Sequence, residues 1–176
     1  MPFLSIVTRH LTNRKALLSR CVQSLESQTD KDFEHIIIED PIGIGIEQAN
    51  QSLFLNRNRV NGKYVFILDD DVWVTSDHFV ETIKTILSEN PYDILFFKSL
   101  RPSGIMPRIW MLADRGVIDT ACAVVQKDLW KSSIHRFMPY RGGDGVFIKH
   151  LTKRTDNVLW YDSVFTTTDK ARFGGD

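Results

Sequence analysis

Several features that tie a protein to a special environment are scarce or missing in this chain. Cys21 and Cys122 are the only cysteines in 176 residues, and their spacing is not that of a metal site. No apolar run approaches the roughly 18 residues of a membrane span. Lys plus Arg equals Asp plus Glu at 22 each, so no overall charge attracts nucleic acid or anionic lipid.

These absences predict a soluble, cytoplasmic protein with free buried thiols, either complete or a domain of a longer protein. We expect no nucleic-acid partner and no membrane span, and any anion-binding site must be local. The N-terminal apolar stretch is short and lacks the basic leader of a signal peptide. No repeat or low-complexity linker divides the chain, and 43% of its residues are hydrophobic, so residues 1–176 are predicted to form one domain with a full core.

Hydrophobic periodicity predicts strands that alternate with helices, the pattern of an α/β sheet with helices on both faces. The expected strands cover residues 3–8, 33–40, 64–68, 94–98, 119–125 and 158–167, and the expected helices cover 13–28, 46–55, 77–87, 127–132 and 142–153. Residues 101–110 contain two prolines and a glycine and are expected to be irregular.

Three consecutive carboxylates, Asp69, Asp70 and Asp71, follow the apolar run 64–68. In an open α/β sheet, ligands bind outside the carboxyl ends of the strands. Neighbouring carboxylates there need a counter-charge, and Mg²⁺ or Mn²⁺ suits oxygen ligands. The alternative is a solvated acidic turn. Because side chains alternate along an extended chain, Asp70 should face away from Asp69 and Asp71 and matter least for a metal.

The βαβαβ order brings further polar residues to the same edge. Thr8 ends the first strand, Arg9 follows it, and Asp40 ends the second. Parallel strands joined by helices place their carboxyl ends together, so these side chains are predicted to share one crevice with the three aspartates.

Four passages are similar to a known family, the family 2 glycosyltransferases with the GT-A (nucleotide-diphospho-sugar transferase) fold. They are the opening strand 4–8 with 13–14, the unit 24–40, the approach 49–50 with 62–71 to the acidic triplet, and the glycines 142–143 before Asp144. Gly143 stands where the family usually has an acidic residue. The resemblance implies a single three-layer, Rossmann-like domain with a mixed sheet, in which residues 1–100 bind the nucleotide sugar and 101–176 bind the acceptor.

The resemblance also implies roles for particular residues. Thr8 and Asp40 match nucleotide contacts, Asp71 matches the metal ligand, and Asp69 matches a residue that contacts ribose or metal. Their neighbours Arg9 and Asp70 complete the expected donor-binding set. Asp144 matches the general base. The expected partners are a UDP-sugar donor and a carbohydrate acceptor, with Mn²⁺ or Mg²⁺ as cofactor.

The implied reaction moves a sugar from a nucleotide diphosphate to an acceptor hydroxyl, with inversion. A cation at Asp71 and Asp69 would offset the charge of the departing diphosphate, and Asp144 would take the proton of the hydroxyl. Asp144 lies in the first turn of a helix, where the dipole favours the ionised carboxylate.

Other interpretations stay open at this point. Asp144 could only cap its helix, and Asp40 could be a turn residue before Pro41. The pair Asp69 and Asp71 also resembles the nucleophile motif of haloacid-dehalogenase-like phosphatases, although Trp73 stands where those enzymes have Thr or Val. A third alternative is a catalytically degenerate glycosyltransferase-like module that binds carbohydrate.

Overall fold

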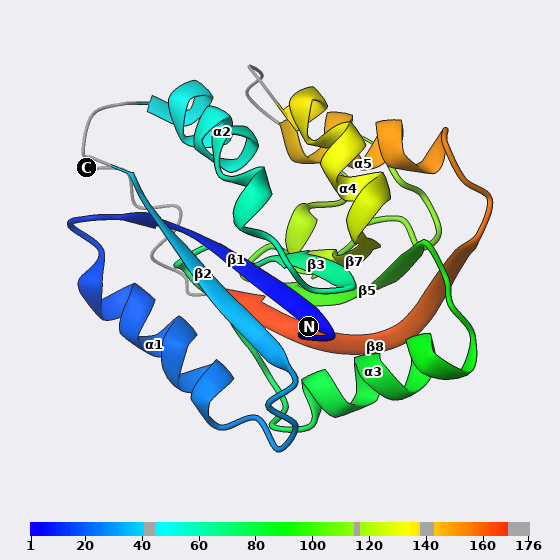
Figure 1. The fold of residues 1–176 in the computed structure, drawn as a ribbon, viewed down its shortest axis with the longest axis horizontal. Coiled ribbons are helices and arrows are strands. Elements are labelled where there is room, and N and C mark those ends of the chain that lie inside the picture. The colour runs from blue at the N-terminus through cyan, green and yellow to red at the C-terminus, as the bar shows by residue number, and fades with distance from the viewer. Residues whose placement is uncertain (41–44, 115–116, 138–142, 169–176) are drawn as a thin grey trace.

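The chain folds around one mixed sheet with helices on both faces (Figure 1). The structure is a computed structural model that describes residues 1–40, 45–114, 117–137 and 143–168. The strands are β1 (Leu4–Leu11), β2 (Phe33–Asp40), β3 (Tyr64–Ile67), β4 (Val72–Val74), β5 (Ile94–Arg101), β6 (Gly104–Met106), β7 (Ala123–Gln126) and β8 (Val158–Thr168). The helices are α1 (Lys15–Glu26), α2 (Gly45–Leu55), α3 (Phe79–Glu89), α4 (Lys127–Ser133) and α5 (Gly143–Thr152), with short 3₁₀ turns η1 (Arg57–Arg59), η2 (Thr120–Cys122) and η3 (Ile134–Phe137).

The described strands form an eight-stranded sheet in the order β2-β1-β3-β7-β5-β8-β4, with β6 paired to β5. Strand β1 pairs in parallel with both β2 and β3, whereas β7 runs antiparallel to β3 and β5. The predicted mixed sheet is therefore confirmed. The parallel pairing also confirms that β1, β2 and β3 end at one edge.

Two hydrophobic clusters cover the two faces of this sheet and explain the apolar run 64–68. Val65 and Ile67 point into the cluster beneath α2, α4 and α5, which includes Leu53, Trp130 and Phe147. Tyr64, Phe66 and Leu68 point into the cluster above α1 and α3. A strand with both faces buried needs apolar residues at every position, because alternate side chains enter opposite layers. Figure 1 shows α1 and α3 on one side and α2, α4 and α5 on the other.

Some predicted boundaries were wrong. Strand β1 continues to Leu11 instead of ending at residue 8, and α1 begins at Lys15 instead of residue 13. The expected strand 119–125 begins only at Ala123, because Asp119 accepts a hydrogen bond from the Ala121 amide (2.9 Å) and starts the turn η2.

The acidic triplet is followed by a strand that periodicity did not predict. Strand β4 pairs antiparallel with the distant β8. In the region expected to be irregular, Gly104–Met106 form the short strand β6. Among the described residues, none of the helices is long or apolar enough to cross a lipid bilayer.

Candidate active site

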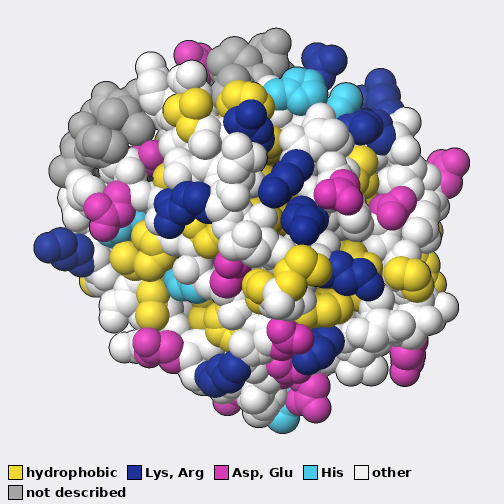
Figure 2. Space-filling view, in the orientation of Figure 1, with side chains coloured by type: hydrophobic (Ala, Val, Ile, Leu, Met, Phe, Trp, Pro, Cys, Tyr) yellow, Lys and Arg dark blue, Asp and Glu magenta, His cyan; other side chains and the backbone are white. Residues whose placement is uncertain are grey.

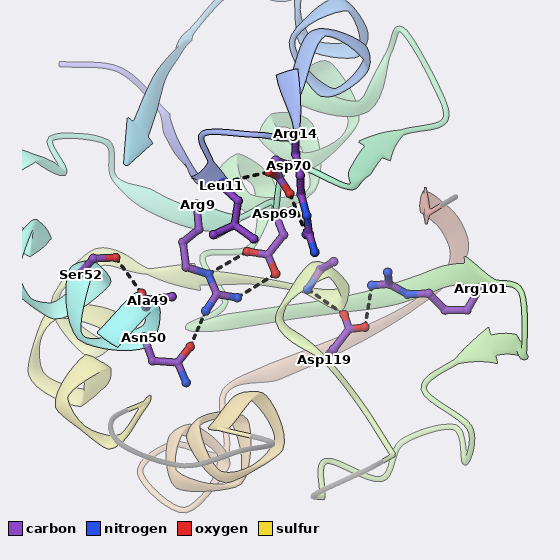
Figure 3. Close-up of polar contacts among 11 residues, drawn as sticks. Arg9, Leu11, Arg14, Ala49, Asn50, Ser52, Asp69, Asp70, Arg101 and Asp119 are labelled. Atoms are coloured by element: carbon purple, nitrogen blue, oxygen red, sulfur yellow. Dashed lines mark hydrogen bonds and ion pairs between the residues drawn. The ribbon is translucent and has the colours of Figure 1, made fainter. Parts of the chain in front are cut away.

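Arg9 lies at the centre of the polar residues at the carboxyl edge (Figure 3). Its Nε and Nη2 atoms donate to the two carboxylate oxygens of Asp69, each at 2.8 Å. Its Nη1 atom donates to the side-chain oxygen of Asn50 on α2. The guanidinium also lies over the Phe137 ring, 5.2 Å from its centroid. This bidentate geometry uses the planar fork of arginine and holds Asp69 in one orientation.

The register of β1 explains why Arg9 points into this site. Val7 belongs to the cluster beneath α2 and α5, and the side chain two residues later leaves the sheet on the same face. Ile38 of β2 belongs to that cluster too, so Asp40, which ends β2, also points to this face.

Electrostatic interactions link Arg9 to three carboxylates that come from different elements. Burial by itself would lower the pKa of Arg9, but Asp69, and then Asp144 and Asp40, outweigh it and raise the pKa. Asp40 is 2% exposed, and its burial raises its pKa, against the effects of a hydrogen bond from Ser52 and the charge of Arg9. Asp40, Asp69 and Asp144 therefore face one shared positive charge, as the topology predicted for Asp40 and Asp69.

Asp144 reaches this site because Gly143 packs against η3. An added Cβ at Gly143 would lie 2.7 Å from the carbonyl oxygen of Phe137 and 3.2 Å from the Asn50 amide nitrogen. No larger residue fits without moving the backbone of η3. This contact explains why glycine replaces the acidic residue usual in the resembling family, and it brings Asp144, in the first turn of α5, close to Arg9. Gly142 lies outside the described residues.

Asp70 has its own partners, on the opposite side from Asp69. Its carboxylate accepts hydrogen bonds from the Leu11 amide (3.1 Å) and pairs with His10 Nδ1 (3.0 Å). Arg14 Nη1 lies 3.5 Å away. His10 and Asp70 are 4% and 3% exposed. The predicted alternation of side chains within the triplet thus separates Asp70 from Asp69. Asp70 is buried and binds residues at the end of β1 and just before α1.

Asp71 is 4% exposed, and its backbone carbonyl accepts a hydrogen bond from the Thr168 hydroxyl at 2.6 Å. This bond connects the triplet to the end of β8. The described residues contain no cluster of three or more His, Cys, Asp or Glu side chains arranged to hold a metal ion. The predicted metal role of Asp71 and Asp69 stays a prediction.

Thr8, predicted to contact the nucleotide, points to the other face of the sheet. It is fully buried, its hydroxyl lies 2.8 Å from His35 Nε2, and it lies 3.9 Å from the Cys21 sulfur. Because these partners belong to β2 and α1, the Thr8 side chain is separated from Arg9 by the sheet. Two contacts of Arg9, Asn50 and Phe137, were not predicted from the sequence. Asn50 belongs to the passage 49–50 that is similar to the glycosyltransferases, whereas no sequence pattern indicated Phe137.

A second ion pair lies across from Arg9, at the end of β5 (Figure 3). Arg101 Nη2 donates to Asp119 at 2.6 Å, and Arg101 is 7% exposed. Its Nε and Nη1 atoms are buried and have no hydrogen-bond partner in the described part of the chain. The pair ties β5 to η2 and so fixes the start of β7.

The fold is that of the GT-A nucleotide-sugar transferases. A comparison of the sequence with protein-family models and with curated proteins finds no match. Solved structures do match, and three of them match over 98% or more of this chain. All share 14% or less of their sequence with this chain, so the likeness establishes the fold.

One similar structure is TarS 1–349 of S. aureus in complex with UDP-GlcNAc, with a TM-score of 0.74, 14% identity, and coverage of 99% of this chain and 60% of that chain. A glycosyltransferase involved in glycosylation of the major capsid of PBCV-1 has a TM-score of 0.61 and 13% identity, with 99% and 95% covered. The mannosyltransferase PcManGT of Pyrobaculum calidifontis, in complex with GDP-Man and Mn²⁺, has a TM-score of 0.67 and 10% identity, with 98% and 58% covered. The chain spans 37% of the TarS structure and 61% of TarS 1–349.

Proposed function

We propose that this chain is a metal-dependent, inverting glycosyltransferase that moves a sugar from a nucleotide diphosphate to an acceptor hydroxyl. The observation that carries the proposal is the meeting of Asp40, Asp69 and Asp144 around Arg9 at the carboxyl edge of a GT-A sheet. This edge is where an open α/β sheet binds its ligand.

The carboxylates suit a hard divalent cation such as Mg²⁺ or Mn²⁺, which commonly takes one or two protein carboxylates and the phosphates of its substrate. Both oxygens of Asp69 already accept hydrogen bonds from Arg9, so we assign the metal chiefly to Asp71. The cation would neutralise charge on the leaving diphosphate. Arg9 holds Asp69 in place for the ribose or the metal, and Asp40 contacts the base.

Asp144 is proposed to accept the proton of the attacking hydroxyl. The N-terminus of α5 and the charge of Arg9 both favour its ionised form. The acceptor would approach from the half of the chain that begins after β5. Direct attack by one hydroxyl, with one carboxylate as base, inverts the anomeric carbon.

The donor is proposed to be a UDP-sugar. A TarS structure contains UDP-GlcNAc and the PcManGT structure contains GDP-Man, so UDP and GDP are the two nucleotides to compare. Thermal unfolding with Mn²⁺ and saturating UDP should raise the midpoint by about 5–10 °C, which corresponds to the roughly 2.7 kcal/mol of a ligand at 100 Kd. The shift should need the metal and should be smaller with GDP.

Asp71→Asn should abolish the metal-dependent shift, whereas Asp156→Asn, at an exposed aspartate away from the site, should keep it. Asp70→Asn should lower stability without ligand but leave metal affinity nearly unchanged, because Asp70 is bonded to His10. If no nucleoside diphosphate shifts the wild-type midpoint, the transferase proposal is wrong.

Asp144→Asn should keep donor binding and reduce transfer about 10²–10⁴-fold, the usual contribution of a general base. Donor binding with no transfer or donor hydrolysis by the wild type would instead identify a carbohydrate-binding module. The phosphatase alternative needs Asp69 as nucleophile, and both its oxygens are bonded to Arg9. Phosphate release from a phosphomonoester that Asp69→Asn abolishes would restore that alternative.

A further inference from the structure

One face of α5 forms a hollow outside the proposed donor site. Val146, Lys149 and His150 have the i, i+3, i+4 spacing of one face of α5, and Lys153, the residue after the helix, continues this spacing. Arg136 of η3 and Asp114 complete the lining. The hollow measures about 360 Å³, which is within the range of small-ligand sites.

The hollow is a local concentration of positive charge in a chain whose net charge is zero. Arg136, Lys149 and Lys153 line it, and among the described lining residues the one carboxylate is that of Asp114, which pairs with Lys149 at 2.8 Å. Figure 2 shows Lys, Arg and His side chains gathered over the α4 and α5 corner of the molecule.

The pKa of His150 reflects the positive charge around this hollow. Its pKa is lowered, first by burial and then by the nearby charges of Arg136 and Arg154, with smaller effects of His135 and Lys153. The rings of His135 and His150 lie 6.0 Å apart, centroid to centroid. Cations that repel a proton from His150 would attract an anion, and a concave surface strengthens this attraction.

We propose that this hollow binds an anionic group, a phosphate or a carboxylate, carried by the acceptor substrate. The inference rests on the proposed function, because α5 also carries the proposed base. Asp144 lies at the first turn of the helix and His150 lies six residues later, about 9 Å along the axis. Lys149 and His150 lie about 120–140° around the helix from Asp144, so an acceptor whose hydroxyl reaches Asp144 would bend around α5 to place its charged group between Lys149 and Lys153.

The first test uses tripolyphosphate as the probe, with the donor site saturated by UDP and diamagnetic Mg²⁺, which is kept in excess over the probe. NMR titration of the imidazole resonances should show that the probe raises the pKa of His150. The variant Lys149→Gln/Lys153→Gln should bind the probe about 3- to 10-fold more weakly, the range expected for two exposed ion pairs. The control Lys15→Gln/Lys31→Gln removes the same charge from exposed positions beside α1 and should bind the probe like the wild type.

Equal weakening by both double variants, or no change at His150, would mean a diffuse charge effect and would overturn the proposal. Tighter binding of a single-stranded oligonucleotide than of tripolyphosphate would indicate a nucleic-acid surface and would also overturn it. In a transfer assay, Lys149→Gln/Lys153→Gln should raise KM for a phosphorylated sugar acceptor, with kcat and the KM for its neutral parent unchanged.

The nucleotide-dependent thermal shift distinguishes a failure of the anion site from a failure of the proposed glycosyltransferase function. If Mn²⁺ and UDP stabilise the protein but the probe does not distinguish the variants, the anion site alone fails. If no nucleotide binds, probe binding is measured without UDP. If it then depends on Lys149 and Lys153, the hollow is an anion site, but its assignment to a glycosyl acceptor is wrong.

Discussion

The ion pair between Arg9 and Asp69 makes a quantitative prediction for Arg9→Met. The substitution keeps a long apolar stem over Phe137 but removes the hydrogen bonds to Asp69 and Asn50. The two charged side chains are 13% and 15% exposed, so the pair resembles a buried pair more than a surface pair. Removing one partner of a buried pair costs about 3–5 kcal/mol, against about 0–1 kcal/mol at the surface.

We expect Arg9→Met to lower the free energy of unfolding by about 3 kcal/mol, towards the low end of the buried range because some solvent reaches both groups. For a chain of this length that corresponds to a fall of roughly 6–12 °C in the unfolding midpoint. Asp69→Asn should cost less, since Asp144 and Asp40 still balance the charge of Arg9.

Urea unfolding of the wild type, both single variants and the double variant gives the coupling energy of the pair. We expect about 1.5–3 kcal/mol, within the range measured for residues in direct contact. The control is Asp162→Asn, because Asp162 pairs with Lys98 but is 68% exposed, and its loss should change stability by at most about 0.5 kcal/mol. A coupling energy below about 0.5 kcal/mol for Arg9 and Asp69 would refute the idea that this pair organises the site.

Three further predictions concern other parts of the fold. Burial lowers the pKa of His35 from 6.5 to about 4. The stability that neutral His35 contributes is therefore complete above pH 6.5 and falls, by up to about 3 kcal/mol, as the pH drops towards 4. In urea unfolding, His35→Gln should lose less stability than the wild type over this pH interval. Gly62→Ala should cost about 1–3 kcal/mol, because its Cβ would lie 2.5 Å from the Ser5 backbone nitrogen; an unchanged urea midpoint would contradict the packing. Arg101→Met should destabilise the protein by about 2 kcal/mol or more, because it leaves Asp119 without its cation. Arg101→Lys should cost less in the same assay, because it keeps one donor for Asp119 and removes the two buried nitrogen atoms that have no hydrogen-bond partner in the described residues.

The local pattern of the chain predicted the elements that carry the edge of the sheet. The run 64–68 could be read as a strand buried on both faces, since it is apolar at every position and ends in three carboxylates. Its two-layer burial is what the structure shows. Helix boundaries were less accurate, because α1 begins at Lys15 after Arg14, which makes no side-chain cap, and periodicity does not resolve the end of a helix without a cap.

Short strands and side-chain partners depended on long-range contacts. The three residues of β4 are too few to show a period, and they become a strand by pairing with β8, more than 90 residues later. Similarly, the Arg9 side chain is placed by Asp69, 60 residues away, and by Asn50 and Phe137. Gly143 is visible in the sequence, but the need for glycine at this position comes from the nearby Phe137 carbonyl oxygen, which lies in another element.

By itself, the sequence determined the order of the three parallel strands and so which segments meet at their carboxyl edge, because hydrophobic periodicity and βα order are local properties that place strand ends at one edge. Asp40 and Asp69 accordingly meet there. Only the tertiary structure decided which way each side chain turns: the register of β1 sends Arg9 towards α2 and α5 and sends Thr8 towards α1. The positive hollow on α5 also needed the fold, since charge adds up through space, and it is the packing of η3 against α5 that brings Arg136 to Lys149 and Lys153.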